Sequence, residues 1–356
     1  MTSRILVWQW GRFGAGPKIA VALADALRSL PDIHVALSLS NRAEILLGPA
    51  PPHCDLPVAT YQGMAGLMGR LIVGPWTILT LARRLRLLAP DLAICAMPGP
   101  IDLLMIAALR LIGARSVIMV HDADAHPGDG SAVQMWLQRQ LCRGASAVAS
   151  LSSHVGERLR AQGLVRGALI ELTLPPLAYG VAPVVPHDGP LRLLHFGRLL
   201  PYKGLDLLAE ALETIGDDPD LTVRVVGSGP ESAELDALRR LPNVTVENRW
   251  VPEDEVAALL TWADALVLPY REASQSGVAA AALAAGRAVV STNVGGLAEQ
   301  LADSKRALLC DPDAAGLAAA IRALLDGQIA LASKAEDPAA AWCSMATSLL
   351  RQAGVA

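Results

Sequence analysis

Residues 192–206 of this 356-residue chain read RLLHFGRLLPYKGLD. The Leu-rich run at 192–196 predicts a strand, and the apolar spacing over 205–214 predicts a helix. Between them lies a loop that holds two glycines and two cations, Arg198 and Lys203. A strand, a glycine-containing loop and a helix in this order form the repeating unit of a parallel α/β sheet. We therefore expect this stretch to open an α/β domain.

The same alternation of short apolar runs and helical patterns extends in both directions along the chain. In the second half, strands are predicted at 192–196, 222–226, 244–247, 265–268 and 288–291, and helices at 205–214, 231–240, 253–262 and 277–284. In the first half, strands are predicted at 4–8, 34–39, 91–96, 115–120 and 147–151, and helices at 17–30, 101–111, 133–142 and 155–162. This pattern predicts two doubly wound, Rossmann-like sheets in tandem, facing a central cleft.

Prolines mark the boundary between the two expected domains. Five of them, with almost no hydrophobic periodicity, fall within residues 175–190 and indicate a linker. We expect an N-terminal domain at 1–174 and a C-terminal domain at 191–335. A helical segment at 336–356 is expected to pack back on the N-terminal domain.

Composition excludes several classes of protein. Hydrophobic residues make up 53% of the chain and charged residues 18%, which excludes a disordered chain or a coiled coil. The net charge of −4 gives no signature of nucleic-acid binding. Five cysteines, without a Cys-x-x-Cys pair, indicate reduced thiols in the cytoplasm. The first half contains no apolar run close to the ~20 residues that a membrane-spanning helix needs.

Charge is unevenly divided between the two halves. Residues 1–190 hold 16 basic and 12 acidic side chains, whereas residues 191–356 hold 14 and 22. The loop at 197–204 is therefore a local concentration of cations in an acidic half. Arg198 and Lys203 at the start of a helix suit a diphosphate, because the helix N-terminus also attracts anions. An ordinary solvated loop is the alternative.

Two later loops also place small residues between a predicted strand and a predicted helix. The sequence GSGPE at 227–231 places Gly227 and Gly229 between a strand and a helix. This loop could contact a nucleotide, or it could be a simple tight turn. Residues 269–290 supply Glu272 at a strand end and small residues at the start of an alanine-rich helix. The amides around Ser276 and Gly277 could bind a phosphate, or the helix could serve close packing alone.

These three loops, in this order, resemble the C-terminal half of the retaining nucleotide-sugar glycosyltransferases of the GT-B fold, in particular glycosyltransferase family 4. The resemblance is strong over 190–330 and weak in the first half. It implies a donor site in which Arg198 and Lys203 neutralise the leaving diphosphate and Glu272 hydrogen-bonds the sugar. It also assigns donor binding to the loop residues Gly197, Gly227, Gly229, Ser276 and Gly277, and contact with the base to the backbone near Val251.

One residue departs from the family pattern. The family has a second glutamate in this region, which usually holds the ribose, but here its place falls on Ala280 or Ala281. The missing carboxylate affects the expected ribose contact more than the expected bond cleavage.

Two segments of the first half also follow predicted strands. WGRFGAGPK at 10–18 is neither a P-loop nor a GxGxxG sequence. The resemblance implies that Gly14 and Gly16 help to bind the donor from the acceptor and phosphate side. HDADAH at 121–126 could be a metal site or an ordinary loop, whereas the resemblance makes His121 a contact of the donor sugar.

Residues 56–90 contain four arginines, many large apolar side chains and no acidic residue. An apolar surface with a cationic edge is typical of a segment that meets anionic lipid, although a core helix pair would give a similar composition. We expect peripheral attachment to the inner face of the cytoplasmic membrane.

The sequence thus predicts a hexosyltransferase of the retaining type that needs neither metal nor cofactor. Its expected substrates are a nucleotide-diphosphate sugar and a saccharide acceptor, expected to be lipid-linked, in exopolysaccharide or cell-surface glycan assembly. The alternatives are a nucleotide-sugar epimerase on the same fold and a non-catalytic binding subunit.

Overall fold

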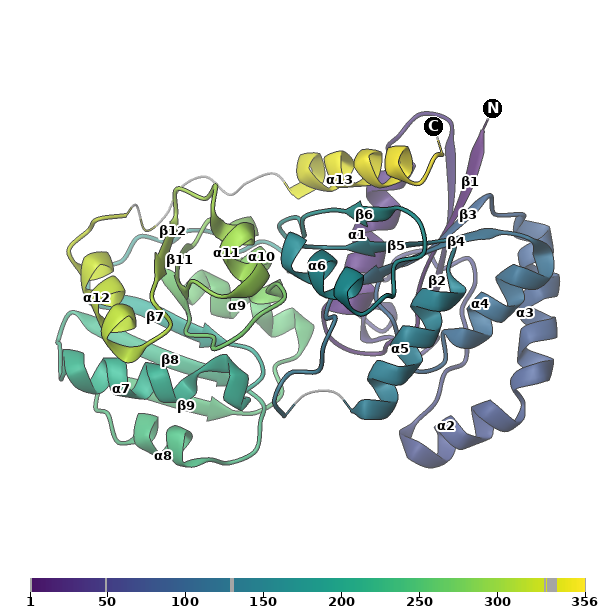
Figure 1. The fold of residues 1–356 in the computed structure, drawn as a ribbon. Coiled ribbons are helices and arrows are strands. Elements are labelled where there is room, and N and C mark those ends of the chain that lie inside the picture. The colour runs from purple at the N-terminus through teal and green to yellow at the C-terminus, as the bar shows by residue number, and fades with distance from the viewer. Residues whose placement is uncertain (1, 49, 129–130, 330, 332–337, 356) are drawn as a thin grey trace. The chain divides into compact units, whose positions relative to one another are not determined.

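A computed structural model describes residues 2–48, 50–128, 131–329, 331 and 338–355 (Figure 1). The chain forms two compact units. The first contains Met1–Ala125, Gly130–Thr173 and Ala339–Ala356, and the second contains His126–Asp129 and Leu174–Pro338. The expected boundary between residues 335 and 336 lies outside the described residues.

The first unit is built on a six-stranded parallel sheet in the order β2-β1-β3-β4-β5-β6. Its strands are β1 (Ser3–Gln9), β2 (Ile33–Leu39), β3 (Leu92–Cys95), β4 (Arg115–Val120), β5 (Ala147–Ser150) and β6 (Leu169–Glu171). Its helices are α1 (Ala15–Arg28), η1 (Glu44–Leu46), α2 (Gly63–Ile72), α3 (Gly74–Leu88), α4 (Leu103–Ile112), α5 (Ala132–Gly144), α6 (Ser153–Ala161) and α13 (Pro338–Gln352).

The second unit repeats this architecture with the strand order β12-β11-β10-β7-β8-β9. Its strands are β7 (Leu191–Phe196), β8 (Leu221–Gly227), β9 (Val244–Asn248), β10 (Ala265–Leu268), β11 (Ala288–Thr292) and β12 (Ala307–Cys310). Its helices are η2 (Pro201–Lys203), α7 (Leu205–Ile215), α8 (Ala233–Arg239), α9 (Glu253–Trp262), α10 (Gly277–Ala284), α11 (Gly295–Leu301) and α12 (Ala314–Leu325).

Burial explains why these segments are strands. Every residue of β3 and β10 is buried, because helices flank a parallel sheet on both faces. The hydrophobic core of each unit lies between its sheet and these helices. The predicted fold class, two doubly wound α/β sheets, is confirmed.

The structure corrects several predicted element bounds. Helix α1 begins at Ala15 rather than 17, because Gly14 at its N-cap has a φ of +79°. Helix α8 begins two residues later than predicted, because the hydroxyl of Ser232 caps it by accepting a hydrogen bond from the amide of Leu235 (3.4 Å). Strands β6 and β12 were not predicted, since three or four residues at a sheet edge give no clear periodicity.

The linker at 175–190 has no regular secondary structure and belongs to the second unit. Arg287, which is almost fully buried, holds it there. Its guanidinium donates to the carbonyls of Ala182 (3.3 Å) and Pro183 (2.6 Å), and also to that of Leu260 on α9 (2.7 Å). These bonds attach the linker to the core of the second unit.

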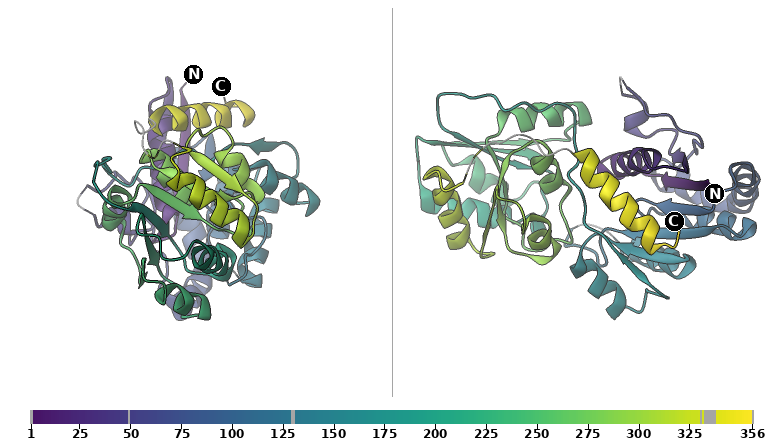
Figure 2. Two further views of the ribbon diagram at one scale, coloured as in Figure 1. Left: turned by 90° about the vertical axis from the view of Figure 1, so that its left-hand side faces the viewer. Right: turned by 90° about the horizontal axis from the view of Figure 1, so that it is seen from above.

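Helix α13 packs in the first unit although it ends the described chain. Figures 1 and 2 both show it beside the first sheet. Trp342 and Leu349 are buried there, and Arg115 at the start of β4 donates to the carbonyl of Ala353. The last helix therefore completes the first unit.

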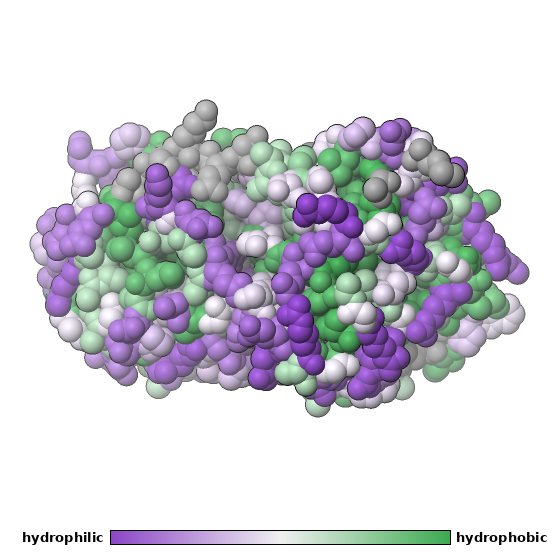
Figure 3. Space-filling model, turned by 45° about the horizontal axis from the view of Figure 1, so that its top comes forward, coloured by the Kyte–Doolittle hydropathy of each residue, from purple (hydrophilic) through white to green (hydrophobic). Residues whose placement is uncertain are grey.

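Hydrophilic and hydrophobic residues are interspersed over the face of the molecule in Figure 3. Within the described residues, no helix combines the length and the apolar character that crossing a membrane requires.

Candidate functional site

The strand order of the second unit marks where a ligand would bind. The order reverses between β7 and β10, which lie side by side, so the loops that follow them diverge to opposite faces of the sheet. Ligands of doubly wound sheets bind at such a switch point, outside the carboxyl ends of the strands. The loop after β7 carries Arg198 and Lys203, and the loop after β10 carries Glu272 and Ser276.

Glycines bring the backbones of these loops into direct contact. A Cβ added at Gly204, whose φ is +68°, would overlap the carbonyl oxygen of Pro269 after β10. A Cβ at Gly227 would overlap the carbonyl oxygen of Gly197, and one at Gly229 would overlap that of Leu199. The three loops that the sequence singled out are therefore packed backbone to backbone, which only glycine permits.

Two tyrosines position the predicted cations. The ammonium of Lys203 lies 3.7 Å from the ring centroid of Tyr270 and 4.8 Å from that of Tyr202. Arg198 donates to the hydroxyl of Tyr202 at 2.9 Å. Aromatic faces attract a cation without cancelling its charge, so the charge of Lys203 remains available at the switch point.

Glu272 is half exposed, and its partner is a histidine that the sequence analysis did not select. His126 donates from Nδ1 to Glu272 at 3.0 Å and stacks on the ring of Tyr202, with centroids 4.6 Å apart. His126 follows β4 in the chain but belongs to the segment that clusters with the second unit. The sequence indicates His126 only through its place in the HDADAH segment, and within that segment His121 was predicted to contact the donor sugar instead.

The N-terminus of α10 is largely satisfied by neighbouring groups. The hydroxyl of Ser276 accepts from the amide of Ala279 (3.2 Å), and the amide of Ser276 donates to Gln300 on α11 (2.8 Å). Among the described contacts, the amides of Gly277 and Val278 have no protein acceptor. They are the groups at this helix end that remain for an anion.

Asn248 at the end of β9 holds the loop at 227–231 in place. Its side-chain oxygen accepts from the amide of Gly229 (3.0 Å), and its amide donates to the carbonyl of Gly229 (3.1 Å) and to Glu231 (2.7 Å). The side chain of Val251 is buried in the core beside α9, so only its backbone could meet a ligand. Asn248 was not selected from the sequence.

Three residues of the first unit were predicted to contact the donor, and local packing explains the conformation of each. Gly14 has a backbone conformation that favours glycine, and a Cβ at Gly16 would clash with the side chain of Gln9. His121 is buried at the end of β4 and donates from Nε2 to the carbonyl of Ala96 (2.9 Å). Burial lowers the pKa of His121 below its usual value, which keeps the ring neutral.

The side chains of HDADAH do not converge. Asp124 accepts from Arg158 on α6 (2.7 Å) and from Gln162, the residue after α6 (2.8 Å), whereas His126 contacts Glu272. Among the described residues, no group of three or more His, Cys, Asp or Glu side chains is arranged to hold a metal ion.

The site of the second unit therefore combines two held cations, free helix amides and a carboxylate supported by a histidine. Cations and amides can stabilise a phosphate that gains negative charge. A carboxylate can accept hydrogen bonds from sugar hydroxyls.

Both parts of the chain match glycosyltransferase families. Residues 190–327 match the family model "Glycosyl transferases group 1", and residues 20–172 match "Glycosyltransferase Family 4". The chain has the fold of the Anabaena protein HepE, whose structure was solved in complex with UDP and glucose, with a TM-score of 0.67 at 18% identity over 98% of both chains. Together these matches support a GT-B glycosyltransferase.

Curated relatives share parts of the chain. It is 34% identical over 215 residues to a glycogen synthase of Mycobacterium tuberculosis, a match that covers 59% of this chain and 49% of that protein. It is 31% identical over 106 residues to a GDP-mannose:glycolipid 4-beta-D-mannosyltransferase of Xanthomonas campestris, over 28% of this chain and 30% of that protein. The chain thus spans half or less of the length of these relatives.

Proposed function

We propose that this chain is a glycosyltransferase that moves a sugar from a nucleotide-diphosphate sugar to an acceptor with retention of configuration. The observation that carries the proposal is the meeting of three glycine loops at the β7–β10 switch point, with Lys203 held between two tyrosines. The family matches and the shared fold with a UDP-binding protein support the same reaction class.

The charge of the site fits the chemistry of this reaction. Breaking the bond between sugar and diphosphate places negative charge on the leaving group. Arg198 and Lys203 would bind that diphosphate, assisted by the amides of Gly277 and Val278. Glu272, oriented by His126, would accept hydrogen bonds from the donor sugar.

The ribose contact of the donor would differ from the family pattern. Ala280 and Ala281, the two positions at which the second glutamate could fall, are both buried in α10. A carboxylate there would be desolvated, so the alanines serve packing and the ribose would be held by other groups.

Replacing Lys203 with alanine tests the donor site. We expect kcat/KM to fall by roughly 100-fold, because a cation that stabilises the leaving group is lost. A panel of nucleotide-diphosphate sugars should also give smaller thermal shifts, since specific binding stabilises the folded state.

Lys305→Ala is the matched control, because Lys305 is an exposed lysine of the same unit. Turnover that survives Lys203→Ala unchanged would contradict the proposed donor site. A chain that binds a partner protein equally well with and without Lys203, and transfers no sugar, would be the binding subunit instead.

An epimerase would need a second free carboxylate or comparable group to exchange a proton. Both oxygens of Asp124 accept hydrogen bonds, one from Arg158 and one from Gln162, which favours a structural role for Asp124. The arrangement therefore supports transfer more than epimerisation.

We also propose that helices α2 and α3 attach the protein to an anionic membrane surface, where a lipid-linked acceptor would be met. Helix α3 exposes a stripe of Trp76, Leu79, Arg83 and Leu87, while Leu81 and Leu85 on its other face are buried. Exposed apolar groups beside arginines suit an interface with anionic headgroups. The likeness to a mannosyltransferase whose name specifies a glycolipid supports this choice of acceptor.

Vesicle sedimentation tests this attachment. Ile72→Gln and Trp76→Gln should each weaken binding to anionic vesicles at low salt by roughly tenfold, because each removes an apolar side chain from the lipid. Leu111→Gln, at an exposed leucine on α4, is the control. Equal binding to anionic and neutral vesicles, or none to either, would contradict the proposal.

A further inference from the structure

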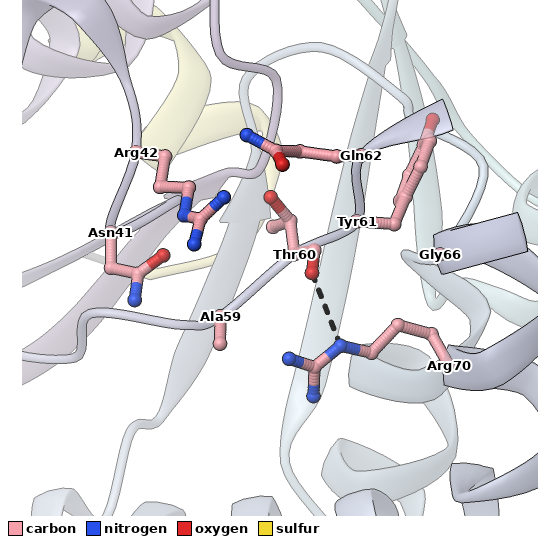
Figure 4. A pocket seen from close by; sticks show the side chains of 8 residues that line it. All are labelled: Asn41, Arg42, Ala59, Thr60, Tyr61, Gln62, Gly66 and Arg70. Atoms are coloured by element: carbon pink, nitrogen blue, oxygen red, sulfur yellow. Dashed lines mark hydrogen bonds between the residues drawn. The ribbon is translucent and has the colours of Figure 1, made fainter. Parts of the chain in front are cut away.

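A polar pocket of about 380 Å³ lies beyond the carboxyl end of β2 in the first unit (Figure 4). This volume falls within the range of roughly 300–1,000 Å³ that is common for small-molecule sites. The pocket is lined by the segment after β2, by residues 59–62 and by one face of α2. None of the donor-site residues lines it.

Two arginines give the pocket its charge. The guanidinium groups of Arg42 and Arg70 point toward the same space beside Thr60, and the amide of Asn41 also points toward it (Figure 4). No lining residue is acidic. Among the described residues, neither arginine forms a salt bridge with a carboxylate.

The position of Arg70 is fixed in a way that leaves it able to bind a ligand. Its Nε donates to the carbonyl of Thr60 at 3.1 Å, while its two terminal nitrogens have no acceptor within the described part of the chain. Thr60 is held in turn by its hydroxyl, 2.8 Å from that of the buried Ser40. The two terminal nitrogens of a fixed guanidinium match two oxygens of a phosphate group.

Helix α2 connects this pocket to an apolar surface. Gly66 and Arg70, four residues apart, share the face that lines the pocket. Met68 and Ile72 lie on the other side of the helix and are 52% and 77% exposed. A molecule with an anionic group next to a hydrocarbon chain would match both sides of this helix.

We propose that Arg42 and Arg70 bind a phosphate group of the acceptor. This inference rests on the proposed glycosyltransferase function and deepens it by assigning the acceptor's chemistry. The phosphate group can belong to a lipid phosphate or to a soluble phosphorylated molecule, and the two sources differ in their need for a hydrocarbon chain.

Binding of farnesyl phosphate to the full-length protein, measured by calorimetry, tests the proposal. Arg42→Gln and Arg70→Gln should each weaken binding about tenfold or more, because each removes a charge-assisted hydrogen bond. Arg139→Gln, at an exposed arginine on α5, should leave the affinity within about twofold. Unchanged affinity in both pocket variants would overturn the proposal.

Two further ligands distinguish a lipid phosphate from a soluble phosphorylated acceptor. Farnesol carries the chain without the anion, and its binding should be insensitive to both substitutions. Inorganic phosphate carries the anion without the chain. If it binds much more weakly than farnesyl phosphate, but still depends on Arg42 and Arg70, the phosphate is that of a lipid; equal affinity assigns a soluble phosphorylated acceptor.

A donor-side variant separates failure of this pocket from failure of the proposed function. Lys203→Ala should abolish most sugar transfer and leave farnesyl phosphate binding unchanged. If the pocket variants bind farnesyl phosphate normally while Lys203→Ala still stops transfer, the phosphate site is contradicted and the proposed glycosyltransferase function is not. If arginine-dependent binding is found but no nucleotide sugar supports transfer, only the proposed function is wrong.

Discussion

Lys203 shows how a single residue determines the charge of the proposed donor site. A carboxylate beside it would hold the ammonium but would also neutralise it, whereas the rings of Tyr202 and Tyr270 hold it by their electron-rich faces. The positive charge therefore stays available to a ligand. Beneath this site, His195 of β7 is fully buried and donates from Nδ1 to the carbonyl of Val267 (3.2 Å).

Burial lowers the pKa of His195 to about 4, and the nearby charge of Lys203 acts in the same direction. The unfolded chain would bind a proton near pH 6.5, so folding stability is present above that pH and is lost as the pH falls toward 4. Between pH 7.5 and 4.5 we expect this group alone to lower the free energy of unfolding by roughly 2–3 kcal/mol.

Denaturant unfolding of the wild-type protein and of His195→Leu at both pH values measures this effect. The variant should lose clearly less stability on acidification, whatever its stability at pH 7.5. The same loss in both proteins would show that His195 does not control the acid sensitivity.

At the residue scale, the sequence predicted those site residues whose type is unusual in their surroundings. Lys203 stands out because the chain has few lysines and this one lies between glycines and a helix start. Tyr202, Asn248 and His126 act through contacts between loops far apart in the sequence, and no local pattern reports such contacts. His121 and His126 share one short segment, so the sequence could not separate them.

At the scale of elements, loop geometry matters more than loop composition. The glycines at 204, 227 and 229 allow three loops to touch, and this contact places Lys203 near the end of β10. The central strands β3 and β10 were predictable because they are unbroken apolar runs. The edge strands β6 and β12 were not, because their pairing with a neighbour is what defines them.

Gly204→Ala should damage the donor site and the stability of the second unit together. The new Cβ would meet backbone and would also force a left-handed conformation, at a cost of roughly 3 kcal/mol or more. We expect a fall in Tm of about 6 °C or more, measured by calorimetry, and loss of donor binding.

Gly216→Ala provides the comparison, because Gly216 has a φ of +84° with open space around its Cβ position. It should cost only about 1 kcal/mol and leave donor binding intact. Similar effects of the two substitutions would mean that the close approach to Pro269 is unimportant.

At the scale of the whole molecule, the first unit is discontinuous in sequence. Its sheet is formed by residues before 173, but α13 contributes Trp342, Met345 and Leu349 to its interior. Hydrophobic patterning could indicate a terminal helix there but could not identify the surface that it covers. Hydrogen bonds from Arg115 to Ala353 and from Gln352 to Glu171 show that this surface belongs to β4 and β6.

Truncation after residue 338 should therefore destabilise the first unit. Burial of the large apolar side chains of α13 contributes on the order of 5 kcal/mol, so the unit should unfold at a markedly lower temperature and become sensitive to protease. Truncation after residue 353 keeps these side chains and should be nearly neutral. If both truncations melt like the full chain, α13 does not support the first unit.

The place of α13 in the chain also sets an order of assembly during synthesis. The second unit, apart from the short segment at 126–129, is continuous in sequence, so almost all of it is synthesised before α13. The first unit must wait, with part of its interior uncovered, until α13 has been synthesised. The domain that is translated first is thus the one completed last, and its open interior is the surface that a chaperone would meet.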